Sequence, residues 1–354
     1  MFGEVSVVEQ SYRRRADGVQ VRPYSVRAGM QSRGYSLPLQ RALSDFGADN
    51  AFGQVPQKMR EHYGIEVSAS AARTITEAHG AAMAAQQQAA LEKELGPEPG
   101  WEWVLAEADG CMLPLVEPSA TSTDKRKEKT LRWEEARLCL ARPLATVTAR
   151  YAATLLGTVA DVGAQWLDCA VRAGAGAQTH LHCVGDGASW IARQVEEQFG
   201  AQGQYLLDFY HVSEYLGAAA KRCAKNPKAW RQAQQTALKE NRVTEVLAAL
   251  APYREPATMP DLEAPVRVCE RYLNNHLENL DYAYALAQEL PIGSGEIESS
   301  HRYVIQARLK RPGAWWRAEN AEKMLALRTQ RANQEWDTYW QKLCQAPAEN
   351  FVPF

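Results

Sequence analysis

The chain has 354 residues, 46% of them hydrophobic and 23% charged, and its formal net charge is −2. This is the composition of an ordinary globular protein of about two or three domains, and it excludes a chain that is basic throughout, as many nucleic-acid-binding proteins are. The seven cysteines are widely spaced without a zinc-knuckle pattern, and no apolar run is long enough for a signal peptide or a membrane span. We therefore expect a soluble, cytoplasmic protein with reduced thiols and no membrane partner.

Residues 1–36 form a basic segment without clear periodicity. Its arginines are Arg13, Arg14, Arg15, Arg22, Arg27 and Arg33. Two interpretations are open at this point, a solvated leader and an arm that contacts DNA.

Residues 37–95 follow a helical pattern. We expect one helix to begin at Leu37, a second to occupy residues 52–63 and end at Gly64, and a third to be capped by Ser68 or Ser70. A helix, a short turn with glycine and another helix make up the DNA-binding helix-turn-helix arrangement. The alternative is an ordinary helical hairpin.

The pattern changes after the breaker Gly96-Pro-Glu-Pro-Gly100. Strands are predicted at residues 101–108, 131–141, 144–152, 179–185 and 205–208, with helices at 159–172 and 190–199. This order predicts an α/β fold with a mixed sheet and helices on its faces, spanning residues 101–209. Residues 210–290 show only helical patterns, and residues 291–345 contain a breaker, a helix at 296–311 and a last long helix at 319–343.

Two aspartates are candidates for a metal site. Asp109 follows the first predicted strand and Asp186 follows the fourth, and each has a glycine beside it. Such a position exposes a carboxylate at the edge of a sheet and lets a ligand approach the backbone. Two such side chains on neighbouring strands can hold a hard cation such as Mg²⁺. The alternative for each aspartate is a simple Asp-Gly turn.

Glu298 lies at the start of the helix predicted at 296–311, where an acidic residue can also act only as a cap. The residues that follow are basic, and two tryptophans lie among them. These cations are Arg302, Arg308, Lys310, Arg311 and Arg317. A carboxylate among phosphate-binding cations is typical of an enzyme that acts on a phosphodiester backbone. Periodicity does not decide between Glu296 and Glu298, because they point to different sides of a helix.

Three carboxylates suit phosphodiester chemistry. Cleavage of a phosphodiester and the joining of a 3′-hydroxyl to another phosphate both use two divalent metals. Asp and Glu supply hard oxygen ligands for these metals. A further element is Asp208-Phe-Tyr-His211, for which a helix-capping aspartate and a structural histidine are the alternative.

Four blocks in this order resemble bacterial insertion-sequence transposases of the DDE type, close to the Mutator-like group. They are Asp109-Gly110, Val184-Gly-Asp-Gly-Ala-Ser-Trp-Ile191, Tyr205-Leu-Leu-Asp-Phe-Tyr-His-Val-Ser-Glu-Tyr-Leu216, and Pro291-Ile-Gly-Ser-Gly-Glu-Ile-Glu-Ser299 followed by Arg308-Leu-Lys-Arg-Pro-Gly-Ala-Trp-Trp316. The similarity runs from about Leu37 to about Arg331, and the combination is more specific than any single block.

The resemblance implies a ribonuclease-H-like catalytic core with a helical insertion at 210–290. It implies that Asp109, Asp186 and Glu298 are the catalytic triad and bind Mg²⁺ or Mn²⁺, with two ions expected. It places Asp208 and His211 beside the active site in DNA handling, and residues 37–95 in DNA binding. The implied partners are double-stranded DNA, as terminal inverted repeats and target, and further copies of the chain on that DNA, in the bacterial nucleoid.

The sequence departs from this family in one respect. Relatives often carry a cysteine-based zinc module near the amino terminus, whereas no cysteine precedes Cys111 here. Recognition of element ends through zinc is therefore not supported. Two other functions compete with transposition: a catalytically silent DNA-binding protein derived from a transposase, and a metal-dependent nuclease or phosphatase.

Overall fold

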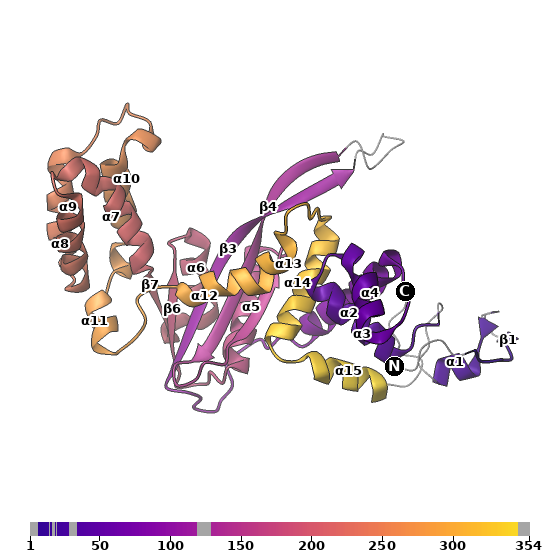
Figure 1. Cartoon of the computed structure of the whole chain (residues 1–354). Coiled ribbons are helices and arrows are strands. Elements are labelled where there is room, and N and C mark those ends of the chain that lie inside the picture. The colour runs from indigo at the N-terminus through magenta and orange to yellow at the C-terminus, as the bar shows by residue number, and fades with distance from the viewer. Residues whose placement is uncertain are drawn as a thin grey trace.

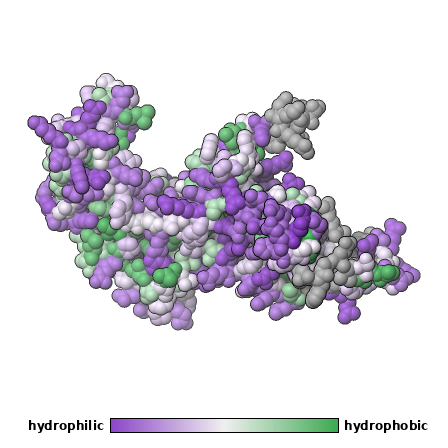
Figure 2. Space-filling model, in the orientation of Figure 1, coloured by the Kyte–Doolittle hydropathy of each residue, from purple (hydrophilic) through white to green (hydrophobic). Residues whose placement is uncertain are grey.

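The computed structural model describes residues 6–13, 15, 18, 20–27, 34–118 and 129–345. Arg14 and Arg33 of the basic amino-terminal segment lie outside these residues. A central sheet separates two helical regions, with the amino-terminal helices at one end and the helices of residues 209–287 at the other (Figure 1). Figure 2 shows that hydrophilic residues cover most of this face over both helical regions.

The central sheet has five strands in the order β5-β4-β3-β6-β7. The strands are β3 (Trp103–Pro118), β4 (Lys129–Pro143), β5 (Arg150–Thr154), β6 (His180–Gly185) and β7 (Gly203–Leu207). The pairs β3–β4 and β4–β5 are antiparallel, whereas β3–β6 and β6–β7 are parallel. The mixed α/β fold predicted from the sequence is confirmed.

The strand β3 is longer than predicted, and Asp109 is not at its end. It runs to Pro118 because it pairs with β4 along its whole length, from Val104↔Pro143 to Pro118↔Lys129. On its other edge, the pairing with β6 stops at Glu107↔Val184. Asp109 therefore lies inside β3, just beyond the point where its parallel partner ends. Past this point β3 and β4 continue as a hairpin that projects from the sheet (Figure 1).

Each face of the sheet is covered by helices. Because successive strand residues point to opposite faces, Ala106 and Ala108 lie on one side of β3, and Glu107 and Asp109 on the other. The first face packs against α5 (Val159–Arg172) and α6 (Ser189–Phe199), around the buried Trp166. The second packs against α12 (Gly295–Ser300), the π-helical segment η6 (His301–Gln306), α13 (Ala307–Leu309) and α14 (Ala318–Ala332).

Residues 209–287 form a helical unit that follows β7. Its helices are α7 (Phe209–Cys223), α8 (Pro227–Lys239), α9 (Val243–Leu250), α10 (Pro265–Asn275) and α11 (Tyr282–Ala287). They enclose a hydrophobic core of their own, which includes Leu216, Val246 and Leu273 and continues to Leu207 at the end of β7. The unit is thus attached to the sheet through the carboxyl end of β7.

The amino-terminal region is helical as predicted. Two short strands, β1 (Tyr12–Arg13) and β2 (Gln20–Val21), and α1 (Pro23–Arg27) precede α2 (Leu37–Asp49), η1 (Phe52–Gln54), α3 (Val55–Tyr63) and α4 (Ala69–Ala89). Gly64 ends α3 with a φ of 66°, a left-handed conformation that glycine adopts without strain. Ser68 is the cap of α4, since its Oγ accepts a hydrogen bond from the Ala71 amide at 3.0 Å.

The amino-terminal helices share a core with the end of the chain. Leu37 and Met83 pack with Tyr339 and Trp340 of α15 (Trp336–Gln345). The helices α4 and α14 approach so closely that a Cβ at Gly80 would lie 2.5 Å from the carbonyl oxygen of Lys323. Residues 37–95 and the carboxyl-terminal helices therefore form one packed unit.

One helix prediction near the carboxyl terminus is wrong, and the bounds of two other predicted elements differ. The helix expected at 319–343 is divided, because Gln334 adopts a φ of 60° between α14 and α15. The side chain of its neighbour Asn333 binds the backbone of Tyr151 in β5. Its Oδ1 accepts from the Tyr151 amide at 2.8 Å, and its Nδ2 donates to the Tyr151 carbonyl at 2.9 Å. The helix expected at 296–311 ends at Leu309 and contains η6. The strand expected at 144–152 begins only at Arg150.

No helix of the described residues has the length and apolar character needed to cross a membrane.

Candidate functional site

Asp109 and Asp186 follow the pairing of two neighbouring strands. The parallel pairing of β3 with β6 ends at Glu107↔Val184. Each aspartate lies two residues beyond this last pair. Each aspartate binds a nearby backbone amide through one oxygen: Asp109 Oδ1 accepts from Gly110 at 2.7 Å, and Asp186 Oδ1 from Ala188 at 2.9 Å. The other oxygen of Asp186 has no hydrogen bond among the described residues, whereas Oδ2 of Asp109 faces His301.

The turn after Asp186 depends on glycine. Gly187 has a φ of 91°, a conformation that side chains rarely adopt, and a Cβ there would lie 2.9 Å from the hydroxyl of Tyr272. That hydroxyl donates a hydrogen bond to the carbonyl oxygen of Asp186 at 2.5 Å. Tyr272 of α10 therefore fixes the backbone of Asp186 from the helical unit.

The loop before α12 is tied to the carboxyl ends of β6 and β7. His182 donates from Nε2 to the carbonyl of Pro291 at 2.7 Å, and the amide of Phe209 donates to the carbonyl of Ile292 at 2.9 Å. Asp208 Oδ2 accepts from the amide of Ser294 at 2.8 Å and also from its hydroxyl. These contacts set the position at which α12 begins.

Asp208 is buried and both of its carboxylate oxygens are used within the protein. Its Oδ1 accepts from the amides of Tyr210 at 2.6 Å and His211 at 3.1 Å, so Asp208 caps α7. Its other oxygen holds Ser294. His211, on the first turn of α7, contacts the rings of Tyr215 and Tyr272 at centroid distances of 5.5 and 6.0 Å. Asp208 thus joins the start of α7 to the loop before α12. His211 contacts the ring of Tyr272, and the hydroxyl of Tyr272 binds the carbonyl oxygen of Asp186.

Glu107 anchors α12 on β3. Its side chain is fully buried, and Oε2 accepts the amide hydrogen of Ile297 at 2.7 Å. Burial raises the pKa of Glu107 to about 8, although the hydrogen bond from Ile297 opposes this shift. The carboxyl group is therefore mostly protonated at neutral pH. Its hydrogen bond to Ile297 identifies Glu107 as the support of α12.

Glu296 and Glu298 have different surroundings. Glu296 forms an ion pair with Arg142 of β4, whose Nε donates at 2.7 Å to its Oε2, and Arg142 also donates to the carbonyl of Thr146 at 2.8 Å. The side chain of Glu298 is exposed and has no hydrogen bond or ion pair with any described residue. Of the two, Glu298 is the glutamate available to a ligand.

His301 was not singled out in the sequence. It is 3% exposed, and its Nε2 lies 3.3 Å from Asp109 Oδ2, an ion pair without hydrogen-bond geometry. Burial lowers the pKa of His301, but Asp109 and Cys111 outweigh burial and raise it to about 9. Its position three residues after Glu298 was the available sequence clue, because residues three apart are neighbours on a helix.

The predicted phosphate-binding cations fall into two groups. Arg302, Lys310 and Arg317 are exposed, whereas Arg308 is buried. Arg308 donates from Nε to the carbonyl of Gly47 at 3.0 Å, and Arg311 donates from Nε to the carbonyl of Ala307 at 2.9 Å. The exposed group is free to meet a polyanion, and Arg308 joins α13 to α2.

A metal site would need at least two hard donors, and Asp109 and Asp186 are carboxylates of that kind. Within the described ranges, no group of three or more His, Cys, Asp or Glu side chains is close enough to hold a metal ion. Glu298 is exposed on α12, which is anchored beside Asp109 through Glu107 and His301. The structure therefore places the two aspartates just beyond the paired parts of neighbouring strands and leaves Glu298 on the adjoining helix.

These features define a mixed α/β protein with a pair of aspartates at the edge of its sheet. The sequence model of the uncharacterised protein family UPF0236 matches residues 62–340, and the chain belongs to this family. The match contains Asp109, Asp186 and Glu298 and most of the described fold. No curated protein matches the chain.

Proposed function

We propose that this protein is a DDE transposase of the insertion-sequence type, which cleaves DNA at the ends of its element and joins the freed 3′-hydroxyls to target DNA. One observation carries the proposal: Asp109 and Asp186 each lie two residues beyond the last pair of the neighbouring strands β3 and β6, and the helix of Glu298 is anchored on the same strand as Asp109. The ion pair between Glu296 and Arg142 supports Glu298 as the third carboxylate.

The sheet supports a ribonuclease-H-like core. Three consecutive antiparallel strands, β3, β4 and β5, are followed by two parallel strands, β6 and β7, on the other side of β3. The helical unit of residues 209–287 lies between the second aspartate and the glutamate, where the resemblance to Mutator-like transposases implies an insertion. The connection through β7 and Asp208 keeps the ends of this insertion together.

The donor set suits Mg²⁺ or Mn²⁺, and two ions are proposed. The carboxylates of Asp109 and Asp186 are hard ligands, and the side chain of Glu298 has no described partner that would hold it away. Divalent ions at such a site activate the attacking oxygen and stabilise the leaving oxygen of a phosphodiester. His301 holds Oδ2 of Asp109, and Glu107 and Asp208 hold the amino end of α12, so the chain positions each carboxylate separately.

The DNA partner is proposed to lie along the exposed cations Arg302, Lys310 and Arg317. Residues 37–95 are proposed to bind the terminal inverted repeats through α3 and α4 in a helix-turn-helix arrangement, and several copies of the chain are proposed to act together on DNA. The packing of α4 on α14 supports the proposal that both regions bind the same DNA, because it fixes the amino-terminal helices to the carboxyl-terminal part of the chain.

The test is a cleavage and joining assay on a supercoiled plasmid that carries the DNA flanking this gene, with protein and Mg²⁺. Cut ends and joined products are expected from the wild type and not from Asp186→Asn or Glu298→Gln. Glu196→Gln, an exposed glutamate on α6 without a described side-chain contact, is the matched control and should cut and join normally.

Two outcomes would reject the proposal as a whole, and a third would reject only the choice of catalytic residues. Specific DNA binding without cleavage in any divalent metal would indicate a silent DNA-binding protein. Cleavage without joined products would indicate a nuclease. Equal activity of Asp186→Asn and wild type would show that the triad assignment is wrong.

A further inference from the structure

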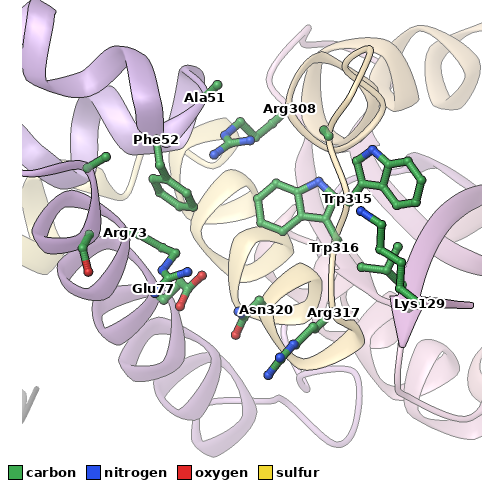
Figure 3. A pocket seen from close by; sticks show the side chains of 14 residues that line it. Ala51, Phe52, Arg73, Glu77, Lys129, Arg308, Trp315, Trp316, Arg317 and Asn320 are labelled. Atoms are coloured by element: carbon green, nitrogen blue, oxygen red, sulfur yellow. The ribbon is translucent and has the colours of Figure 1, made fainter. Parts of the chain in front are cut away.

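A cavity of about 960 Å³ lies between the amino-terminal helices and the projecting hairpin (Figure 3). One wall consists of η1 and the first turns of α4, and the other of β3, β4 and residues 314–317. It is separate from the aspartate pair, because Val116 in its wall lies seven residues beyond Asp109 on β3, about 23 Å at 3.3 Å per residue. The cavity is assembled from segments that are distant in the sequence.

The cavity is positively charged. Its walls carry four cations, Arg73, Lys129, Arg308 and Arg317, against the single carboxylate of Glu77. None of the four forms an ion pair with an acidic residue in the described parts of the chain. An uncompensated group of cations in a partly enclosed space attracts an anionic ligand.

Arg308 is the most buried of these cations, at 3% exposure. Its guanidinium lies between the rings of Phe52 and Trp316, at 4.9 and 4.7 Å from their centroids. Burial, together with the charge of Arg311, lowers the pKa of Arg308 to about 10, so it stays protonated at neutral pH. Only its Nε has a described hydrogen bond, to Gly47. A buried charge with so few partners is costly, and a bound phosphate would compensate it.

Aromatic side chains lie beside these cations. Trp315 is 49% exposed on the cavity wall, and the Nζ of Lys129 lies 3.9 Å from its ring centroid. Trp316 is 6% exposed, and its buried indole N–H has no hydrogen-bond partner among the described residues. A phosphate-binding cation beside an exposed indole is suited to a nucleotide, which carries both an anion and a flat base.

The cavity is also within reach of Glu298 along a DNA strand. Glu298 and Arg308 lie ten residues apart on the nearly continuous segment of α12, η6 and α13, which is about 15 Å at 1.5 Å per residue. At 3.4 Å per nucleotide, about four or five nucleotides span this distance.

We propose that the cavity binds one unpaired nucleotide of a DNA strand that also passes the aspartate pair. Its phosphate contacts Arg73, Arg308 and Arg317, and its base stacks on Trp315. This inference rests on the proposed function, because it takes DNA as the substrate.

The experiment measures DNA binding by the full chain in EDTA, which prevents cleavage. The probes are a blunt duplex and the same duplex with a single-stranded extension of about five nucleotides that contains 2-aminopurine. The wild type is expected to bind the extended probe about tenfold more tightly and to quench its fluorescence by stacking. Trp315→Ala should lose the preference and the quenching, whereas Trp315→Phe should keep part of both. Arg73→Gln should lower affinity for the extended probe.

Matched controls exclude a general effect on charge or folding. Trp101→Ala removes an exposed tryptophan outside the cavity, and Arg193→Gln removes an exposed arginine on α6, so both should bind as the wild type does. Equal affinity for the two probes, or an unchanged preference in Trp315→Ala, would overturn the proposal. The proposal would also be overturned if free dAMP displaced the extended probe as effectively as unlabelled extended duplex does. That result would indicate a free nucleotide as the ligand.

The two proposals fail separately. If the plasmid is cut and joined but the extension brings no preference, only the cavity inference fails. If the extension is preferred but no cleavage or joining occurs, the transposase proposal fails and the nucleotide site stands.

Discussion

His301 and Asp109 are 3.3 Å apart, Nε2 to Oδ2, and this contact joins the start of η6 to the centre of β3. Asp109 lies two residues beyond the last pair of β3 with β6, so the histidine faces one of the two carboxylates that follow this pairing. The buried imidazole has a pKa raised to about 9 and is charged at neutral pH. The pair therefore orients the carboxylate and fixes the helix of Glu298 relative to it.

If Asp109 binds a metal ion in a DNA-cleaving enzyme, as proposed, replacing His301 by glutamine should slow cleavage by about 10- to 100-fold. It should also shift the Mg²⁺ dependence to higher concentration, because His301 orients this ligand. DNA binding in EDTA should not change. His180→Gln, an exposed histidine at the start of β6, is the control. A normal Mg²⁺ dependence in His301→Gln would show that the contact is only structural.

The same ion pair predicts a loss of stability in base. Because the folded pKa of His301 is raised above its model value of 6.5 to about 9, its contribution is complete below pH 6.5 and is lost as the pH rises through 9. Between pH 7 and 10, the denaturation midpoint of the wild type should fall more than that of His301→Gln. Parallel curves for the two proteins would contradict the assigned charge.

His79 should cause a loss of stability in acid, whereas His301 causes one in base. It is buried between α4 and α15, with Nδ1 2.8 Å from the hydroxyl of Tyr339 and Nε2 3.0 Å from Oε1 of Gln40, and burial lowers its pKa from 6.5 to about 3. Its contribution to stability is complete above pH 6.5 and is lost as the pH falls toward 3, by at most about 1.4 kcal/mol per pH unit. Urea denaturation of wild type and His79→Gln at pH 7 and pH 5 tests this, and a wild type no more acid-sensitive than the variant would contradict it.

Glu107 should tolerate glutamine and not alanine. Since its pKa is raised to about 8, the carboxyl is mostly neutral at pH 7, and the Gln side chain keeps an oxygen for the Ile297 amide. Glu107→Ala leaves that amide without its acceptor, at a cost of about 1–3 kcal/mol, and releases α12. Thermal denaturation of the two variants is the measurement. Similar losses in both would show that the charge of Glu107 matters and not its hydrogen bond.

Gly187→Ala should destabilise the turn after Asp186. The residue has a φ of 91°, and a Cβ would lie 2.9 Å from the Tyr272 hydroxyl, so about 1–3 kcal/mol of strain is expected, together with displacement of Tyr272. Gly53→Ala is the control, because a Cβ there meets nothing within 4 Å. A larger loss of stability at Gly53 than at Gly187 would contradict this account.

The sequence by itself determined the elements whose pattern is local. The helix at 159–172 was predicted with the bounds of α5, and Gly64 was predicted as the end of α3, because hydrophobic period and capping residues act over a few positions. The two aspartates were found for the same reason, since each adjoins a glycine next to a buried strand.

Tertiary structure decided what depends on partners far along the chain. The length of β3 follows from its pairing with β4, and the break at Gln334 accompanies the binding of Asn333 to β5. The choice of Glu298 over Glu296 depends on Arg142, which lies more than 150 positions away. Hydrogen bonds and ion pairs act over about 3 Å in space whatever the separation in sequence, so no local pattern could reveal them.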